Sequence, residues 1–112
     1  MFPLHRGRRL RTNESIRSLV RETTLSPSDF MFPMFIAEGE NYQVEIASMP
    51  GIFRRSIDLT VKEIQELFAL GIRAVNIYVK VSENLKDNTG KEAWNPDGLM
   101  QNAIRSIKAA CP

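Results

Sequence analysis

The sequence predicts an α/β fold in which short parallel strands alternate with amphipathic helices. Strand-like and helix-like segments alternate after residue 30, and the connection between the two strands is long enough for a crossover, which favours parallel pairing in a right-handed unit. A chain of 112 residues with 43% hydrophobic and 25% charged residues is one globular domain or part of one. We divide it into a basic arm, residues 1–29, and a strand and helix region, residues 30–112.

The first strand is predicted at residues 30–37. This stretch, "FMFPMFIA", is apolar on both faces, as in a buried strand, although Pro33 removes one backbone donor from the ladder. The segment that follows, residues 40–56, is polar, and we expect an irregular excursion there. Its "MPG" at 49–51 places proline and glycine where a type II turn needs them.

The next two elements are a helix at 58–70 and a strand at 73–81. Ser56 or Asp58 can cap the helix and Gly71 can end it. Its predicted apolar stripe consists of Val61, Ile64, Leu67 and Phe68. The strand alternates strictly, with Val75, Ile77, Val79 and Val81 on one side and Ala74, Asn76, Tyr78 and Lys80 on the other.

A last helix is predicted at 95–110. Asn95 can cap it, with Pro96 in the first helical position and Asp97 at its positive end. Its expected buried stripe is Leu99, Ala103, Ile104 and Ile107. The polar segment before it, "LKDNTGKEAWNPDGL" at 85–99, lacks the alternating acids of a calcium loop and any histidine or cysteine. We therefore interpret it as turn and helix-entry chemistry, with Trp94 as a packing anchor.

The arm is strongly basic. Residues 5–21 hold six arginines and one acid, Glu14, although the net charge of the whole chain is only +2. Thr12 or Asn13 can cap a short amphipathic helix that carries Ile16 and Leu19. Such an arm suits nucleic acid, an acidic lipid surface, an acidic patch on a partner subunit or plain solvent. No aromatic residue is interleaved among the arginines for base stacking, which argues against nucleic acid.

Single copies of two residue types exclude several kinds of site. Cys111 is the one cysteine and His5 the one histidine, so we expect no disulfide, no zinc cluster and no Cys/His or Ser/His pair built from one copy of the chain. We assign Cys111 no role beyond that of a small hydrophobe. No signal peptide or membrane span is expected, and a lone thiol favours a reducing, cytoplasmic location.

Two parallel strands alone would leave two open edges, whereas parallel sheets are normally covered on both faces. We therefore expect further strands beyond this sequence. A TIM (β/α)₈ barrel needs about 250 residues. The present chain would supply an N-terminal arm and the first two βα units of such a barrel, which is incomplete as it stands.

Three separated motifs, "SMPG", "LKDNTGKEA" and "NPDGL", together with "RRLR" and "LSPSDF", resemble the N-terminal third of porphobilinogen synthases, also called 5-aminolevulinate dehydratases. The resemblance covers nearly the whole chain. It implies a TIM-barrel hydro-lyase that condenses two 5-aminolevulinate molecules into porphobilinogen on the route to haem and other tetrapyrroles. It also implies a Mg²⁺ or Zn²⁺ cofactor, with the catalytic lysines and metal ligands beyond Pro112. No catalytic or metal-binding residue is therefore expected in this chain, which should be inactive alone.

The resemblance also implies that the arm wraps a neighbouring subunit of a homo-oligomer. The residues that we assign to this assembly arm are Arg8, Arg9, Arg11, Ile16 and Leu19. With a protein partner for the arginines, no nucleic acid and no membrane are expected as partners. The alternative, from a different class, is a self-standing interaction module that uses its open strand edges and basic arm for assembly.

The sequence departs from this family pattern at the end of the second strand. Where relatives usually carry phenylalanine, then glycine or proline, then an apolar residue, this chain has Tyr78, Val79 and Lys80. In a barrel Tyr78 and Lys80 would face the interior and line the substrate pocket. A lysine there can be desolvated and attack a ketone, although a solvated strand-end lysine is the simpler interpretation. Glu38 and Glu40 are weaker candidates for metal binding or proton transfer.

Overall fold

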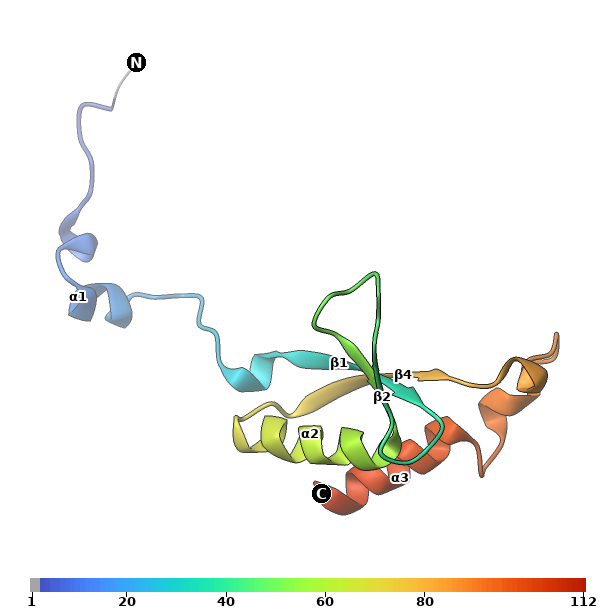
Figure 1. Cartoon of the computed structure of the whole chain (residues 1–112). Coiled ribbons are helices and arrows are strands. Elements are labelled where there is room, and N and C mark those ends of the chain that lie inside the picture. The colour runs from blue at the N-terminus through green and yellow to red at the C-terminus, as the bar shows by residue number, and fades with distance from the viewer. Residues whose placement is uncertain (1–2) are drawn as a thin grey trace.

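The computed structural model describes residues 3–112 and contains one mixed four-stranded sheet with two helices on one of its faces (Figure 1). The strands are β1 (Met31–Ala37), β2 (Gln43–Glu45), β3 (Phe53–Arg55) and β4 (Ala74–Lys80), in the spatial order β2-β3-β1-β4. The helices are α1 (Glu14–Leu19), α2 (Ile57–Ala69) and α3 (Leu99–Ala110). The predicted α/β class is confirmed.

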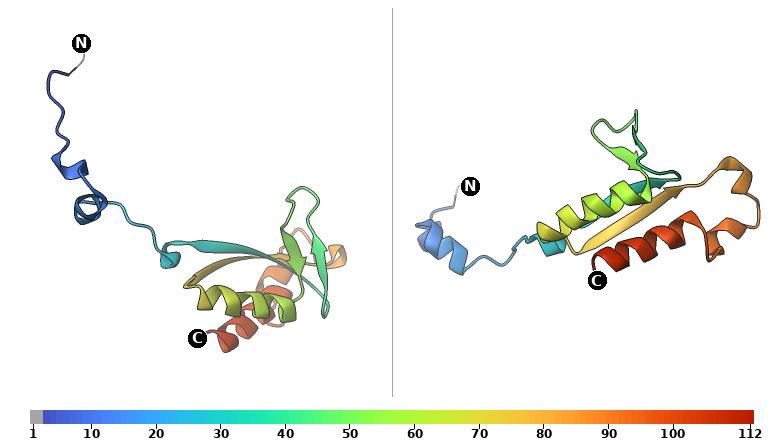
Figure 2. Two further views of the ribbon diagram at one scale, coloured as in Figure 1. Left: turned by 60° about the vertical axis from the view of Figure 1, so that its left-hand side comes forward. Right: turned by 60° about the horizontal axis from the view of Figure 1, so that its bottom comes forward.

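The two long strands pair in parallel over their whole length. The register runs from Met31 opposite Ala74 to Ala37 opposite Lys80. The crossover helix α2 and the last helix α3 lie on the same face of this pair, as the two views in Figure 2 show. Because the register has no offset, the carboxyl ends of β1 and β4 reach the same edge of the sheet.

The prediction that residues 40–56 lack strands is wrong. They form the antiparallel pair β2–β3, and β3 in turn pairs in parallel with β1, with Phe35 opposite Arg54. The type II turn is confirmed, because Ile52 N–H donates to the Met49 carbonyl at 3.0 Å and Gly51 has a φ of +80°. Strands of three residues are too short for alternation to be visible in a sequence, and their polar character hides them further.

The core lies between the sheet and the two helices. Met34, Ile64 and Ile107 form its buried centre, and Val75 and Ile77 pack against it. The predicted alternation of β4 is therefore confirmed at Val75 and Ile77, which face the core, and Cys111 also contacts this cluster. Ile36 has no exposed surface at all.

Two members of the predicted helix stripes are not buried. Phe68 is 40% exposed and Ile104 is 39% exposed. Phe68 lies at the end of α2, where the Arg73 guanidinium covers its ring at 4.1 Å from the centroid. On α3, which carries Ile104, the buried residues are Ala103 and Ile107. Each helix therefore buries a narrower stripe than its sequence predicts.

The last helix begins four residues later than predicted, at Leu99, and Gly98 rather than Asn95 precedes it. The Asn95 side chain instead accepts a hydrogen bond from Asp97 N–H at 3.0 Å, which closes an Asx turn. A β-carbon at Gly98 would lie 2.7 Å from the Gln101 side-chain oxygen and 3.1 Å from the Asn95 carbonyl oxygen, so a larger residue here would displace the Gln101 side chain. Local turn chemistry thus replaces the predicted cap.

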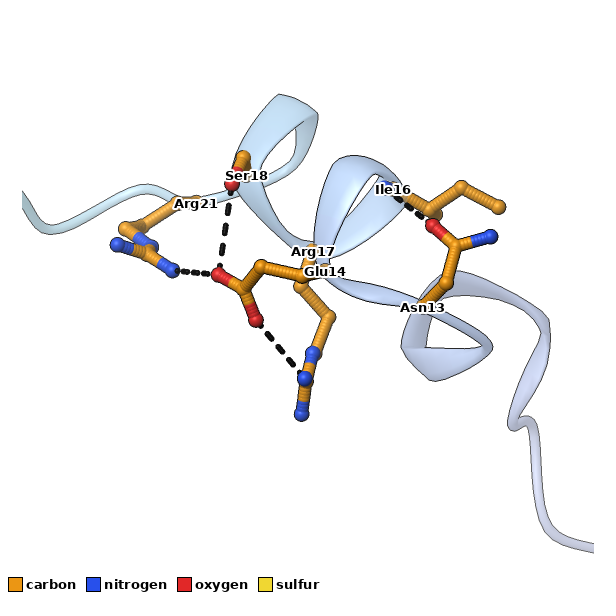
Figure 3. Close-up of polar contacts among 6 residues, drawn as sticks. All are labelled: Asn13, Glu14, Ile16, Arg17, Ser18 and Arg21. Carbon is orange, nitrogen blue, oxygen red and sulfur yellow. Dashed lines mark hydrogen bonds and ion pairs between the residues drawn. The ribbon is translucent and has the colours of Figure 1, made fainter.

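The basic arm extends away from the sheet (Figures 1 and 2). Asn13 caps α1 by accepting the Ile16 N–H at 3.0 Å, and Glu14 pairs with Arg17 and Arg21 at 2.8 Å each (Figure 3). These pairs are exposed, and such pairs contribute only about 0–1 kcal/mol each. Leu19 is 85% exposed, and no residue of α1 is buried within the described chain.

Candidate functional site

The candidate site is the edge of the sheet where β1, β3 and β4 end. Ligands of parallel α/β sheets bind at the carboxyl ends of the strands, because the loops there are held by the strands but remain accessible. Three segments meet at this edge: the loop 38–42 after β1, the start of α2 after β3, and the loop 81–98 after β4. None of the helices in the described residues is long and apolar enough to cross a membrane.

Ser56 fastens the loop after β1 to the start of α2. Its side chain is fully buried, and its hydroxyl accepts the Tyr42 N–H at 3.0 Å, while Ser56 N–H donates to the Tyr42 carbonyl at 2.9 Å. Asp58 accepts the neighbouring Asn41 N–H at 3.1 Å. The pKa of Asp58 lies below its ordinary value of 3.8, first because the Ser56 side chain hydrogen-bonds to it and then because Asn41 N–H does.

Arg55 ties the β2–β3 pair to the helix layer. Its guanidinium pairs with Glu63 of α2 at 2.6 Å and donates to the Gln43 side chain at 2.9 Å. Both charged side chains are about three quarters buried, with exposures of 21% and 26%. Arg55 therefore points to the same side of the sheet as α2.

Tyr78 and Lys80 lie on the opposite side of β4 from the helices. The Tyr78 ring stacks on Phe35 of β1, with the centroids 5.4 Å apart and the planes at 20°. The Asn76 side-chain amide donates to the Tyr78 hydroxyl oxygen at 2.8 Å. Tyr78 is 49% exposed and Lys80 is exposed at the end of the strand. The structure thus places the two predicted pocket residues on one face, and Asn76 joins them there.

The two glutamates after β1 have different surroundings. Glu38 accepts a hydrogen bond from the Ser82 hydroxyl at 2.9 Å, which links the loop after β1 to the loop after β4. Glu40 is exposed. Within residues 3–112 no group of three His, Cys, Asp or Glu side chains is arranged to hold a metal ion. Glu38 therefore acts as a connection between loops.

The first half of the loop 81–98 is organised by two acids. Asp87 accepts hydrogen bonds from Thr89 N–H at 2.9 Å and from the Thr89 hydroxyl at 2.7 Å. The pKa of Asp87 is lowered, first by the Thr89 side chain and then by the Lys91 N–H. Glu83 pairs with Lys86 at 2.6 Å, and this hydrogen bond is the first cause of its lowered pKa.

The second half of this loop borders a cavity of about 450 Å³ beside the end of β4. Its apolar walls include Val79, Leu85, Leu99 and Met100. Trp94, in contrast, is 70% exposed, so the prediction that it anchors packing is wrong for the described residues. Trp94 ends the short helix Lys91–Trp94, in which no residue is buried.

Sequence reasoning missed the contacts of Ser56 with Tyr42 and of Arg55 with Glu63. The first joins the loop after β1 to the start of α2, and the second joins the unpredicted strand β3 to α2, so no periodicity could have revealed them. The contact between Asn76 and Tyr78 was accessible in principle, because residues two apart on a strand point to the same face.

Comparisons with known proteins agree with the resemblance drawn from the motifs. The family model described as delta-aminolevulinic acid dehydratase matches residues 4–112. Delta-aminolevulinic acid dehydratase of Synechococcus elongatus is 43% identical over 112 residues, which are 100% of this chain and 34% of that protein. The Bacillus subtilis protein of the same name is 41% identical over 108 residues, which are 96% of this chain and 33% of that protein.

A solved structure extends the agreement to the fold. The crystal structure of delta-aminolevulinic acid dehydratase (porphobilinogen synthase) from Toxoplasma gondii, in complex with the reaction product porphobilinogen, matches with a TM-score of 0.88 and 40% identity. The match covers 96% of this chain and 30% of that one. The chain thus spans about a third of the length of these relatives. On the family-model match and these relatives, the chain belongs to the delta-aminolevulinic acid dehydratase family.

Proposed function

We propose that this chain is the N-terminal portion of a porphobilinogen synthase, a hydro-lyase that condenses two 5-aminolevulinate molecules to porphobilinogen in tetrapyrrole and haem biosynthesis. The likeness of the whole chain to the Toxoplasma gondii enzyme, with a TM-score of 0.88 over 96% of this chain, carries the proposal. The parallel β1–β4 pair with α2 and α3 on one face is the centre of the matched fold. The uncovered second face of the pair supports its place in a TIM barrel, with residues 1–29 as an arm and 30–112 as the first two βα units.

In this proposal the catalytic lysines lie in the remainder of the full-length protein. The metal, Mg²⁺ or Zn²⁺, would also be held there, because the described residues of this chain do not fit a metal site. The contribution of this chain to the pocket is then the face of β4 that carries Tyr78 and Lys80. Their position at the carboxyl end of a strand, opposite the helices, supports that role.

The arm is proposed to hold a second copy of the protein in a homo-oligomer located in the cytoplasm. Apolar side chains on it have no cover within the described chain: Leu10 is 59%, Leu19 85% and Leu25 79% exposed. Burying an apolar side chain of this size stabilises an interface by about 1.5–3 kcal/mol. Arg8, Arg9, Arg11 and Ile16 would lie in the same contact.

The alternative function is a self-standing interaction module. Such a module must be stable as an isolated chain. In this chain β4 is paired on one edge only, and an open strand edge favours aggregation. Size-exclusion chromatography with light scattering separates the two: a single defined species with cooperative unfolding favours the module. Aggregation or variable oligomers favour the portion of a larger barrel.

A chimera tests the enzyme proposal directly. The matching third of the Synechococcus elongatus relative, to which this chain aligns over all 112 residues, is replaced by this chain. Porphobilinogen formation from 5-aminolevulinate is then measured for the chimera, the parent enzyme and the isolated chain. We expect an active chimera and an inactive chain. A soluble, oligomeric chimera with no activity, or an isolated chain that forms porphobilinogen, would contradict the proposal.

A further inference from the structure

The second edge of β1 is only partly occupied. On one edge β4 pairs with β1 along its whole length, from Met31 to Ala37, whereas on the other edge β3 pairs with β1 only at Phe35 and Ile36. Among the described residues, the stretch from Met31 to Met34 therefore has no strand beside it on this second edge. Unpaired backbone groups at a strand edge are a ready template for a further strand.

The short pair β2–β3 limits how far such a strand can extend. Arg55 of β3 is held by its ion pair with Glu63 of α2, and the loop that leads into β2 is bonded to the start of α2 through Tyr42 and Ser56. The pair is thus attached to the helix layer and keeps its place beside the carboxyl end of β1. Because each edge of a strand accepts one neighbour, a further strand can pair with residues 31–34 and must end where β3 begins.

A small cavity of about 60 Å³ lies beside the same edge, between β1, the segment that leads into β3, and α2. Most of its walls are apolar, and they include Phe32, Met34, Ile52 and Phe53. One water molecule takes up about 30 Å³ in the liquid, so this space suits one small apolar side chain. The open backbone and the cavity therefore suit the same occupant, a strand that carries such a side chain toward α2.

Arg54 is the third feature of this edge, and it lies on the opposite side of the sheet. Because Arg55 points toward α2, its neighbour Arg54 points to the side without helices. Arg54 is half-buried, and no acidic side chain within residues 3–112 forms an ion pair with it. It lies opposite Phe35 in the register, just beyond the stretch of β1 that is open. A guanidinium held there needs oxygen acceptors from another segment.

We propose that a strand from the remainder of the full-length protein pairs with β1 along residues 31–34 and inserts a small apolar side chain into the cavity. It ends against β3, where Arg54 binds the carbonyl or carboxylate oxygens at its end. The inference rests on the proposed function, because the chain spans about a third of its relatives and a barrel must close on its first strand. It adds that β2–β3 replaces the closing strand beside the carboxyl end of β1, next to the candidate site.

Photo-crosslinking of the full-length protein that contains this chain identifies the occupant. Photo-methionine differs little from methionine in size, and Met31 and Met34 both lie on the open stretch, where Met34 also lines the cavity. We expect crosslinks from both residues to one segment in the C-terminal part of the protein, mapped by mass spectrometry. Met34→Leu conserves volume and should remove only the crosslinks of residue 34. Met100, beside the far end of β4, is the control and should link to a different segment.

Mixed oligomers of ¹⁵N-labelled and unlabelled protein separate the two sources of such a strand. Crosslinked peptides of one isotope come from the same polypeptide, as the proposal requires. Crosslinks between a labelled and an unlabelled peptide would place a second copy on this edge and overturn the proposal.

Amide hydrogen exchange tests the role of Arg54. Hydrogen bonds from a charged group are among the stronger ones, so exchange of the crosslinked segment should become about tenfold to a hundredfold faster in Arg54→Gln. Amides of β4 should keep their protection. Lys62→Gln, on the exposed side of α2, is the matched control and should change neither.

Activity and crosslinking report separately on the proposed function and on this inference. A protein that forms porphobilinogen, but in which Met31 and Met34 link to no segment beyond Pro112, overturns the inference alone. Unchanged exchange of the linked segment in Arg54→Gln overturns the role of Arg54. A protein with the expected crosslinks but without porphobilinogen formation overturns the proposed function and leaves the closing strand in place.

Discussion

Replacing Ser56 by alanine tests how the loop after β1 is held at the candidate site. The hydroxyl of this fully buried serine accepts the Tyr42 N–H at 3.0 Å and lies 3.3 Å from the Tyr42 carbonyl. Alanine removes both contacts and also the hydrogen bond between the Ser56 side chain and Asp58, while the backbone bond from Ser56 N–H to Tyr42 remains. The substitution therefore weakens one defined attachment without changing the strand or the helix.

The expected magnitude follows from these contacts. A hydrogen-bond partner lost from a buried site costs about 1–3 kcal/mol. Tyr42 is 43% exposed, so water can replace part of the lost bond and the lower end of that range applies. We expect the free energy of opening of the loop to fall by about 1–2 kcal/mol, which corresponds to roughly a 5- to 30-fold change in population.

Amide hydrogen exchange of the full-length protein measures this opening directly. The protection of the Asn41 and Tyr42 amides should fall roughly 5- to 30-fold in Ser56→Ala, while amides of β4 should keep theirs. Ser18→Ala, at an exposed serine of the arm, is the control. Unchanged protection at Tyr42, or an equal loss across the whole sheet, would refute the reasoning that Ser56 acts locally on this loop.

Three other perturbations have defined outcomes. The pKa of Asp87 is lowered from 3.8 in the folded state, so the ionised Asp87 side chain stabilises the fold above pH 3.8 and this stabilisation is lost as the pH falls below the folded-state pKa. Thr89→Val removes the hydroxyl that Asp87 binds, so the difference in urea midpoint between the parent and Thr89→Val should vanish in acid. Ile107→Ala, at a core residue that is 8% exposed, should cost about 2–4 kcal/mol by chemical denaturation. Gly71→Ala should cost about 1–3 kcal/mol in the same assay, since Gly71 has a φ of +97° and an added β-carbon would lie 3.0 Å from Pro27; no loss would contradict the strain argument.

Long periodic patterns were reliable guides to the fold. The alternation around Val75 and Ile77 located β4 and its core-facing side, because a strand of seven residues repeats its two faces several times. The 13-residue α2 was predictable for the same reason, with Ser56 before it and Gly71 after it. Motifs were equally informative, since those quoted from the chain indicated the family that the comparisons show.

Features that depend on contacts between distant segments were not predictable. The pair β2–β3 consists of three-residue strands, and it is stabilised by Arg55 and Glu63, which no local pattern connects. The sequence prediction started α3 too early. The residues Asn95, Asp97 and Gly98 are compatible with a helix cap and also with an Asx turn, and the local sequence does not distinguish the two. Trp94 was predicted to anchor packing, but its side chain is 70% exposed. The burial of an aromatic side chain depends on which element packs beside it, and the local sequence does not show this.

The sequence by itself determined the class of the fold, the long elements, the basic arm and the family, because these depend on spacing and residue type along the chain. The tertiary structure alone decided the candidate site. It placed Phe35, Arg54 and Tyr78 in one row and aligned Ala37 with Lys80. The physical reason is strand register: it is fixed by backbone pairing and core packing between segments far apart in the sequence, and it decides which side chains share a face.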